Sequence, residues 1–135
     1  IYKFFKDVDK KRYKDLIFIS FHYNQLHHLK KLLPDIKAFY ITSYSDKNPS
    51  EFLIQTKDEL SKLLIKAKKN KIDGIDFEWS NFLTKNIIDM VKKEGLETAV
   101  WSYEKDDTRQ NAKKCQSLKV DYFTTNYPLS HKATS

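Results

Sequence analysis

Three of the four histidines in the chain lie near its start, at His22, His27 and His28. Histidine is a common metal ligand and proton shuttle, so these residues are the first candidates for chemistry. A metal pair on a helix needs ligands three or four positions apart, because only such side chains share a face. His27 and His28 are adjacent and would diverge by about 100° around a helix. The spacing indicates structural or solvated histidines, and only His22, at the expected end of a strand, could reach a substrate.

Two carboxylates, Asp76 and Glu78, are separated by one residue, so they share one face of a predicted strand. Such a pair could hold a metal ion or divide the roles of general acid and general base. We favour a different interpretation, in which one carboxylate caps the following segment and the other pairs with a lysine. If the strand directs Glu78 into a cavity, Glu78 is the best polar pocket residue in the chain.

Large aromatic residues stand where two predicted strands end. In the stretch "ETAVWSY", the alternation along a strand places Ala99, Trp101 and Tyr103 on one face. Phe21 ends an earlier strand in the same way. Two interpretations stay open, because such rings can line a binding pocket or simply fill the core.

A basic cluster and a single cysteine are the remaining candidates. Lys66, Lys68, Lys69 and Lys71 gather at the end of a predicted helix, where cations complement the helix dipole. We favour that role over phosphate recognition. Cys115 lies on an apolar helix stripe, so we expect it in the core rather than as a nucleophile.

The elements that would position these residues alternate along the chain. Continuous apolar runs are typical of strands that are buried on both faces. The predicted strands cover residues 16–21, 37–43, 74–79, 97–103 and 121–128. Apolar stripes at helical spacing predict helices between them. The predicted helices cover residues 24–33, 50–70, 84–94 and 106–118, and the stripe over residues 50–70 is broken near Gln55 to Asp58. Asn24 and Thr84 are expected N-caps, and Asp106 or Asp107 is expected to begin the last helix.

This alternation predicts the fold class. A leading helix is expected over residues 1–15 and a frayed tail over residues 129–135. Right-handed crossovers between parallel strands leave two architectures, a doubly wound sheet and an α/β barrel. Five strands are little more than half of a barrel of roughly 250 residues. We therefore predict an α/β fold in which residues 1–135 form a single partial domain and residues 16–128 hold its β/α units.

The composition excludes several classes of function. Two glycines are too few for a phosphate-cradling loop or a dinucleotide fingerprint. Lysine and arginine outnumber acidic residues by 25 to 18, but only Arg12 and Arg109 are arginines, which argues against a nucleic-acid partner. No apolar run approaches the roughly 20 residues of a transmembrane segment. The chain begins at Ile1 rather than at a methionine, so we expect it to be a piece of a longer protein.

Several stretches together resemble one family. They are "FISF" with the following "LLPDIKAFYIT", then "LTKNIIDMVKKEGLETAVWSYE", and finally "LKVDYFTTNYP". In order and spacing, from about residue 16 to residue 128, they are similar to glycerophosphodiester phosphodiesterases. The resemblance implies a (β/α)8 barrel of the TIM type, of which this chain would supply strands four to eight.

The resemblance also implies an activity. The family hydrolyses glycerophosphodiesters to an alcohol and glycerol 3-phosphate with a divalent cation, calcium or magnesium. Its catalytic histidines and metal-binding carboxylates lie in a His-Arg-Gly turn and in Glu-x-Asp, His-Asp and Glu-x-Lys motifs, which this chain lacks. We therefore assign no catalytic or metal-binding residue here. The expected substrate-pocket residues are Phe21, Glu78, Trp101, Tyr103 and Asn126.

Two positions depart from the family pattern. Asn126 stands where the closing strand usually has aspartate, and Lys119 stands where the family usually has glycine. A tight turn must then be made at Lys119 by a residue with a Cβ atom.

Other functions remain open beside that of a phosphodiesterase lacking its N-terminal motifs. The chain could be an inactive barrel fragment that serves as a binding or interaction module, or an unrelated doubly wound domain of the flavodoxin type. A half barrel would expose unpaired strand edges and an unpacked inner face. We therefore expect the chain to be completed by a missing N-terminal half or by self-association.

Overall fold

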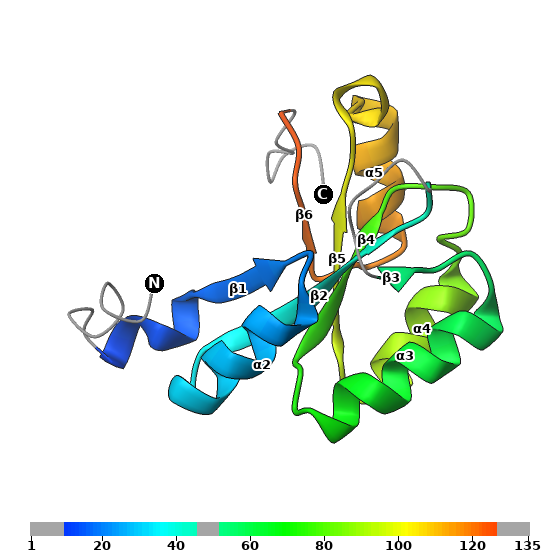
Figure 1. Ribbon diagram of the computed structural model, residues 1–135. Helices are drawn as coiled ribbons and strands as arrows, with labels where there is room; N and C mark the ends of the chain where they lie inside the picture. Colours follow the sequence, from blue (N-terminus) through cyan, green and yellow to red (C-terminus); the bar gives the residue numbers. More distant parts are fainter. Residues whose placement is uncertain (1–9, 46–51, 127–135) are drawn as a thin grey trace.

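The strands of the chain run parallel and lie side by side in the order in which they occur (Figure 1). The computed structural model describes residues 10–45 and 52–126. Its elements are η1 (Lys10–Asp15), β1 (Ile17–Ser20), α2 (Tyr23–Leu32), β2 (Lys37–Ser43), β3 (Phe52–Leu53), α3 (Lys57–Lys69), β4 (Gly74–Glu78), α4 (Lys85–Lys93), β5 (Glu97–Trp101), η2 (Glu104–Asp106), α5 (Arg109–Ser117) and β6 (Tyr122–Phe123).

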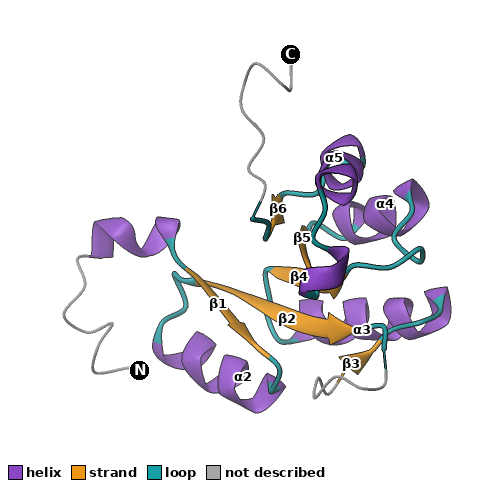
Figure 2. Cartoon of the chain, turned by 90° about the horizontal axis from the view of Figure 1, so that it is seen from above, coloured by secondary structure: helices purple, strands orange, loops and turns teal. Residues whose placement is uncertain are grey.

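The strand order selects between the two expected architectures. It is β1-β2-β4-β5-β6, with the short β3 paired to the end of β2. A doubly wound sheet reverses its order at a switch point, and no reversal occurs along this path. Seen from above, the strands follow a curve and helices α2 to α5 lie on its outer side (Figure 2). The fold is a partial α/β barrel, as predicted, and a flavodoxin-like sheet is excluded.

The outer face of the sheet forms the main core. Tyr40 of β2, Ile75 of β4 and Val100 of β5 are buried in one hydrophobic cluster with helix residues such as Leu26 and Ile88. Burying a large apolar side chain of this kind stabilises the fold by roughly 1.5–3 kcal/mol. The helices therefore pack against the outward-facing side chains of the sheet, which are every second residue of each strand.

The inner, concave face carries the alternate residues in levels set by the strand register. The lowest level holds Phe39, Gly74 and Glu97; the middle level holds Ile41, Asp76, Ala99 and Tyr122; the top level holds Glu78 and Trp101. On the same face, Ile19 of β1 is 56% exposed and Tyr122 is 42% exposed. Within the described residues, this face is therefore only partly covered.

Several predicted element boundaries need correction. The predicted helix over residues 50–70 is wrong in its first part, because Phe52 and Leu53 form β3 and α3 begins only after Thr56. Thr56 caps the helix, because its hydroxyl accepts from the Glu59 N–H, while the Glu59 carboxylate accepts from the Thr56 hydroxyl and from the Gln55 N–H. These local bonds start the helix at the break in the apolar stripe near Gln55 to Asp58.

The last helix and the helices near the start of the chain also begin at residues other than those predicted. The α5 N-cap is Thr108, whose hydroxyl accepts from the Asn111 N–H, and not Asp106 or Asp107. Asn24 lies inside α2 rather than at its start. Of the predicted leading helix, residues 10–15 form the 3-10 helix η1, and residues 1–9 lie outside the described residues.

Three helices end in the same turn, although only one of them ends with glycine. Gly95, Lys71 and Lys119 adopt positive φ values of 78°, 58° and 59° after α4, α3 and α5. In each turn the next N–H reaches back to the helix, as when Val120 donates to the Cys115 carbonyl at 3.3 Å. These are Schellman turns, in which glycine is the usual residue at the left-handed position. The strain expected for Lys119 is thus confirmed.

We expect the Lys119→Gly variant to be more stable than the parent chain by about 0.5–1 kcal/mol, because glycine adopts this backbone conformation without a steric penalty. The Lys119 carbonyl, which accepts from Lys92 Nζ, is retained. Urea unfolding followed by circular dichroism measures the change. Gly95→Lys is the matched reverse variant, because a Cβ at Gly95 meets no atom within 4 Å, and it should lose a similar amount. A lower urea midpoint for Lys119→Gly would contradict this account.

Candidate functional site

Three of the five predicted pocket residues meet at the carboxyl edge of the sheet. The Phe21 and Trp101 rings are edge to face with centroids 6.2 Å apart. The Trp101 and Tyr103 rings are arranged similarly at 5.3 Å. We call Phe21, Trp101 and Tyr103 the aromatic cluster. Active sites of α/β barrels lie at this edge, so the cluster is the best candidate for a binding surface in the described part of the chain.

Trp101 is held in a fixed orientation across the top of the inner face. Its indole Nε1 donates to the Thr42 carbonyl at 3.1 Å, which links β5 to β2 across the intervening β4. Its backbone carbonyl accepts from the Trp79 N–H at 2.7 Å. Trp101 is also only half-buried, so it both anchors the curled sheet and presents aromatic surface at the edge where a substrate would enter.

Glu78 lies beside Trp101 in the register, but its carboxylate is already engaged. One oxygen accepts from the backbone N–H groups of Tyr44 and Ser45, the latter at 2.8 Å. The carboxylate therefore shapes the loop that follows β2. The prediction that one of the two carboxylates caps the segment that follows it is wrong for Glu78, because the loop that it binds precedes it in the chain.

Asp76 lies one level below Glu78 and has no such partner. The residue is 6% exposed, and its Oδ1 atom has no hydrogen-bond partner among the described residues. Its register neighbours are the apolar Ile41 and Ala99. Burial raises the pKa of the Asp76 carboxyl to about 7. The expectation that a lysine would pair with the second carboxylate is wrong within the described part of the chain.

Asn126 is tied to a residue that the sequence did not single out for the site. Its backbone N–H donates to Asp107 Oδ2 at 2.8 Å, and the Thr125 hydroxyl donates to Asp107 Oδ1 at 2.6 Å. These bonds, from Thr125 first, lower the pKa of the Asp107 carboxyl. Asp107 thus joins the loop before α5 to the end of β6. In the sequence Asp107 looked like a helix cap, and nothing there indicated this long-range contact.

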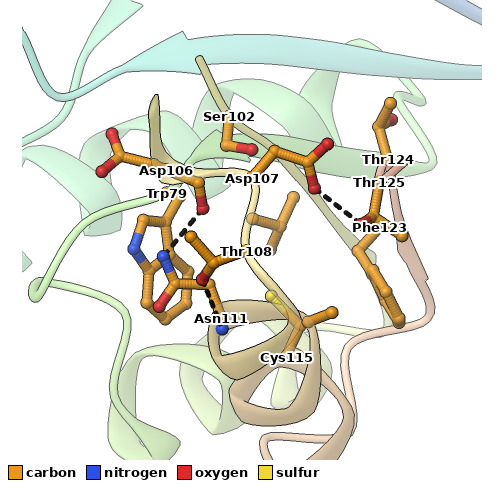
Figure 3. A pocket seen from close by; sticks show the side chains of 12 residues that line it. Trp79, Ser102, Asp106, Asp107, Thr108, Asn111, Cys115, Phe123, Thr124 and Thr125 are labelled. Atoms are coloured by element: carbon orange, nitrogen blue, oxygen red, sulfur yellow. Dashed lines mark hydrogen bonds between the residues drawn. The ribbon is translucent and has the colours of Figure 1, made fainter. Parts of the chain in front are cut away.

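A small hollow lies beneath this loop, between β5, α5 and β6 (Figure 3). Its lining includes Trp79, Ser102, Asn111, Cys115 and Phe123. The volume of about 20 Å³ is enough for one or two waters and not for a substrate. The hollow is therefore a packing feature next to the candidate site.

The histidines and the cysteine lie away from catalytic geometry. The His27 ring Nε2 is 2.6 Å from the Tyr40 hydroxyl on the outer side of the sheet, as expected for a structural histidine. His22 is the N-cap position of α2 and exposed. Cys115 is buried in the core, and burial raises the pKa of its thiol to about 11, which disfavours the nucleophilic thiolate.

The described residues contain no group of three or more His, Cys, Asp or Glu side chains that could hold a metal ion. Asp76 and Glu78 share a face, but the engagement of Glu78 with two N–H groups leaves them unsuited to form a cation site by themselves. Among the same residues, no helix is long and apolar enough to cross a membrane.

Comparisons with known proteins agree with this geometry. The sequence matches the family model described as "Glycerophosphoryl diester phosphodiesterase family" over residues 1–130. No curated protein gives a significant match. A solved structure from Galdieria sulphuraria, assigned as a glycerophosphodiester phosphodiesterase, is 29% identical with a TM-score of 0.64, and the match covers 83% of this chain and 40% of that protein.

A second solved structure supports the fold. It comes from Silicibacter pomeroyi, is assigned as a glycerophosphoryl diester phosphodiesterase, and is 14% identical with a TM-score of 0.62. The match covers 83% of this chain and 35% of that protein. The chain therefore spans less than half the length of either protein.

Proposed function

The chain belongs to the glycerophosphoryl diester phosphodiesterase family, and we propose that it forms the C-terminal part of a barrel that hydrolyses glycerophosphodiesters to an alcohol and glycerol 3-phosphate. The observation that carries the proposal is the aromatic cluster, because it stands at the edge of the sheet where barrel enzymes bind substrate. The short coverage of the two solved relatives supports the view that further strands complete the barrel.

In this proposal the chain contributes binding rather than chemical steps. Trp101, Phe21 and Tyr103 wall the alcohol portion of the substrate. Glu78 holds the loop after β2, and Asn126 stands at the end of the last described strand, so that both shape the rim. The acid and base groups and the ligands of a divalent cation, calcium or magnesium in the family, would come from residues outside the described part. When bound, that cation would supply electrostatic stabilisation of the phosphoryl group.

A second candidate function has its own supporting observation. Ile19 and Tyr122, on the inner face, are 56% and 42% exposed, so this face is only partly covered within the described residues. An inactive barrel fragment would use this face to bind a partner or a second copy of the chain. Size-exclusion chromatography with light scattering distinguishes the cases, since a stable, well-folded monomer would argue against self-association.

A hydrolysis assay tests the main proposal. Glycerophosphocholine with calcium or magnesium is given to the purified 135-residue chain and to a longer chain in which added N-terminal residues complete the barrel. We expect turnover only from the longer chain, because the family motifs are absent here. Turnover by the 135-residue chain would overturn the division of roles, and inactivity of both would favour the interaction module.

In an active longer chain, we expect Trp101→Ala to lower kcat/KM by roughly 10- to 100-fold through a higher KM, because the substrate loses an aromatic wall worth about 1.5–3 kcal/mol. Steady-state kinetics measure the change. Trp79→Ala is the matched control, because Trp79 lies between β4 and α5, away from the inner face, and its loss should leave KM unchanged. Equal KM values for the parent and Trp101→Ala would remove Trp101 from the pocket.

A further inference from the structure

A basic cleft lies at the opposite edge of the sheet from the aromatic cluster. The ends of α2 and α3 flank it, and both helices run back toward the amino edge of the parallel strands (Figure 1). Its volume is about 670 Å³. The lining residues are His27, Lys30, Lys31, Pro34, Lys69, Asn70, Lys71 and Asp73. A concave site of this size suits a small-molecule ligand rather than an extended polymer.

The acidic residue that lines the cleft does not neutralise the positive charge of all its lysines. Asp73 is the acidic lining residue, and it pairs with Lys30, whose Nζ is 2.5 Å from the carboxylate and also donates to the Ile36 carbonyl. Lys31, Lys69 and Lys71 form no ion pair with the described residues. Three ammonium groups, from α2, the end of α3 and the turn after it, therefore line one cleft and have no ion-pair partner among the described residues.

Helix capping does not explain these lysines. The last carbonyls of α3 are already satisfied by backbone donors, since the Ile72 N–H reaches the Ala67 carbonyl and the Lys71 N–H reaches the Lys68 carbonyl. The Asn70 side chain adds a third bond, to the Lys66 carbonyl. In the sequence alone, the dipole role looked sufficient for Lys69 and Lys71. The structure adds Lys31 and the concave surface, which a capping role does not require.

The His27 ring lies in the same positively charged surroundings. Its pKa is lowered by burial first and then by the ammonium groups of Lys66 and Lys31. The other groups that face the ring are the Tyr40 hydroxyl at 2.6 Å and the edge-to-face Tyr23 ring, neither of which is a counter-charge. A bound anion would offset the effect of the lysines and raise the His27 pKa.

We propose that this cleft binds a compact anion carrying several phosphate groups. Lysine is a common phosphate ligand, and the concave shape favours a clustered polyphosphate over an extended nucleic acid. The anion could be a free polyphosphorylated metabolite or the phosphorylated headgroup of a lipid. The proposal goes beyond hydrolysis, because the cleft lies at the edge remote from the candidate active site.

The test uses inositol hexakisphosphate as the free probe and vesicles with or without a polyphosphorylated lipid as the second arm. Calorimetry and NMR titration of the full chain should show saturable binding that weakens with salt, and the His27 pKa should rise with the probe bound. Binding to the lipid vesicles alone would identify the headgroup as the source. No saturable binding in either arm, or an unchanged His27 pKa, would overturn the proposal.

Variants separate the cleft from the net charge of the chain. Lys31→Gln with Lys69→Gln should weaken binding by roughly tenfold or more, because charge-assisted hydrogen bonds are lost. The control, Lys105→Gln with Lys113→Gln, removes the same charge from η2 and α5 and should leave affinity near the parent value. Equal losses in the two double variants would overturn the assignment to this cleft.

One further variant separates a loss of binding from a loss of stability. Lys71→Gly should stabilise the chain, because Lys71 has a φ of 58°, and should weaken binding at the same time. Lys119→Gly relieves the same strain after α5 and should leave binding unchanged. Unchanged affinity in Lys71→Gly would remove Lys71 from the site.

Discussion

The Asp76→Asn variant of the 135-residue chain is expected to become more stable relative to the parent chain as the pH rises. Between pH 3 and a pH above 7, the difference in unfolding free energy between variant and parent should increase by up to about 4 kcal/mol. The cause is the buried carboxyl, whose Oδ1 has no partner among the described residues and whose pKa burial raises from 3.8 to about 7. Each pKa unit corresponds to about 1.4 kcal/mol.

The direction follows from where the proton is bound. Below pH 3.8, Asp76 is protonated in the folded and unfolded chains and contributes no pH dependence. Between 3.8 and about 7, the unfolded chain ionises while the folded chain keeps the proton, so the parent loses stability as pH rises. Above about 7 both states are ionised and the loss is constant. The advantage of Asp76→Asn should therefore grow through this window and then level off.

Urea unfolding of both chains at several pH values measures this difference. Asp35→Asn is the matched control, because it makes the same substitution at an exposed position of the chain. A pH-independent difference for Asp76→Asn would show that the folded chain ionises Asp76 normally. In a completed barrel, a cationic partner for Asp76 would abolish the effect, so repeating the series on the longer chain shows whether Asp76 finds one there.

The Gly74→Ala variant is expected to lose about 1–3 kcal/mol of unfolding free energy through overpacking. A Cβ at Gly74 would lie 2.8 Å from the Glu97 carbonyl oxygen and 2.8 Å from the Phe39 ring. The carbonyl belongs to the neighbouring strand backbone and cannot rotate away. The Phe39 ring is buried on the inner face and stacks edge to face near Tyr122, with centroids 5.9 Å apart.

Thermal and urea unfolding of Gly74→Ala measure this loss. Combining it with Phe39→Leu should recover part of the loss, because the ring contact disappears while the carbonyl contact remains. Full additivity of the two changes would show that the ring plays no part. Gly95→Ala is a useful comparison, since it changes the left-handed turn without any close contact.

Much of the fold could be predicted from local patterns. The apolar runs that became β2 and β4 and the stripe that became α4 are short-range signals, and Thr84 caps α4 as expected. The predicted helix over residues 50–70 began too early, although its apolar stripe is broken near Gln55 to Asp58, where the Thr56 cap starts α3. The closing strand was predicted as eight residues, of which Tyr122–Phe123 pair as a strand among the described positions.

The sequence by itself determined the order of the parallel β/α units, the family pattern and the strained turn at Lys119, because each depends on residues that are near one another in the chain. The tertiary structure alone decided what the polar residues do. Asp76 and Glu78 are two positions apart, yet the buried Oδ1 of Asp76 has no partner among the described residues, and Glu78 binds the loop after β2.

The lysines of the basic cleft are a second case in which the tertiary structure alone decided the arrangement. Lys31 and Lys69 lie 38 positions apart in the numbering, and only the packing of α2 beside α3 brings them to one cleft. Local periodicity specifies which face of an element is apolar. It does not specify which distant backbone groups and charges that face or its ends will meet, because those contacts depend on how the whole sheet curls.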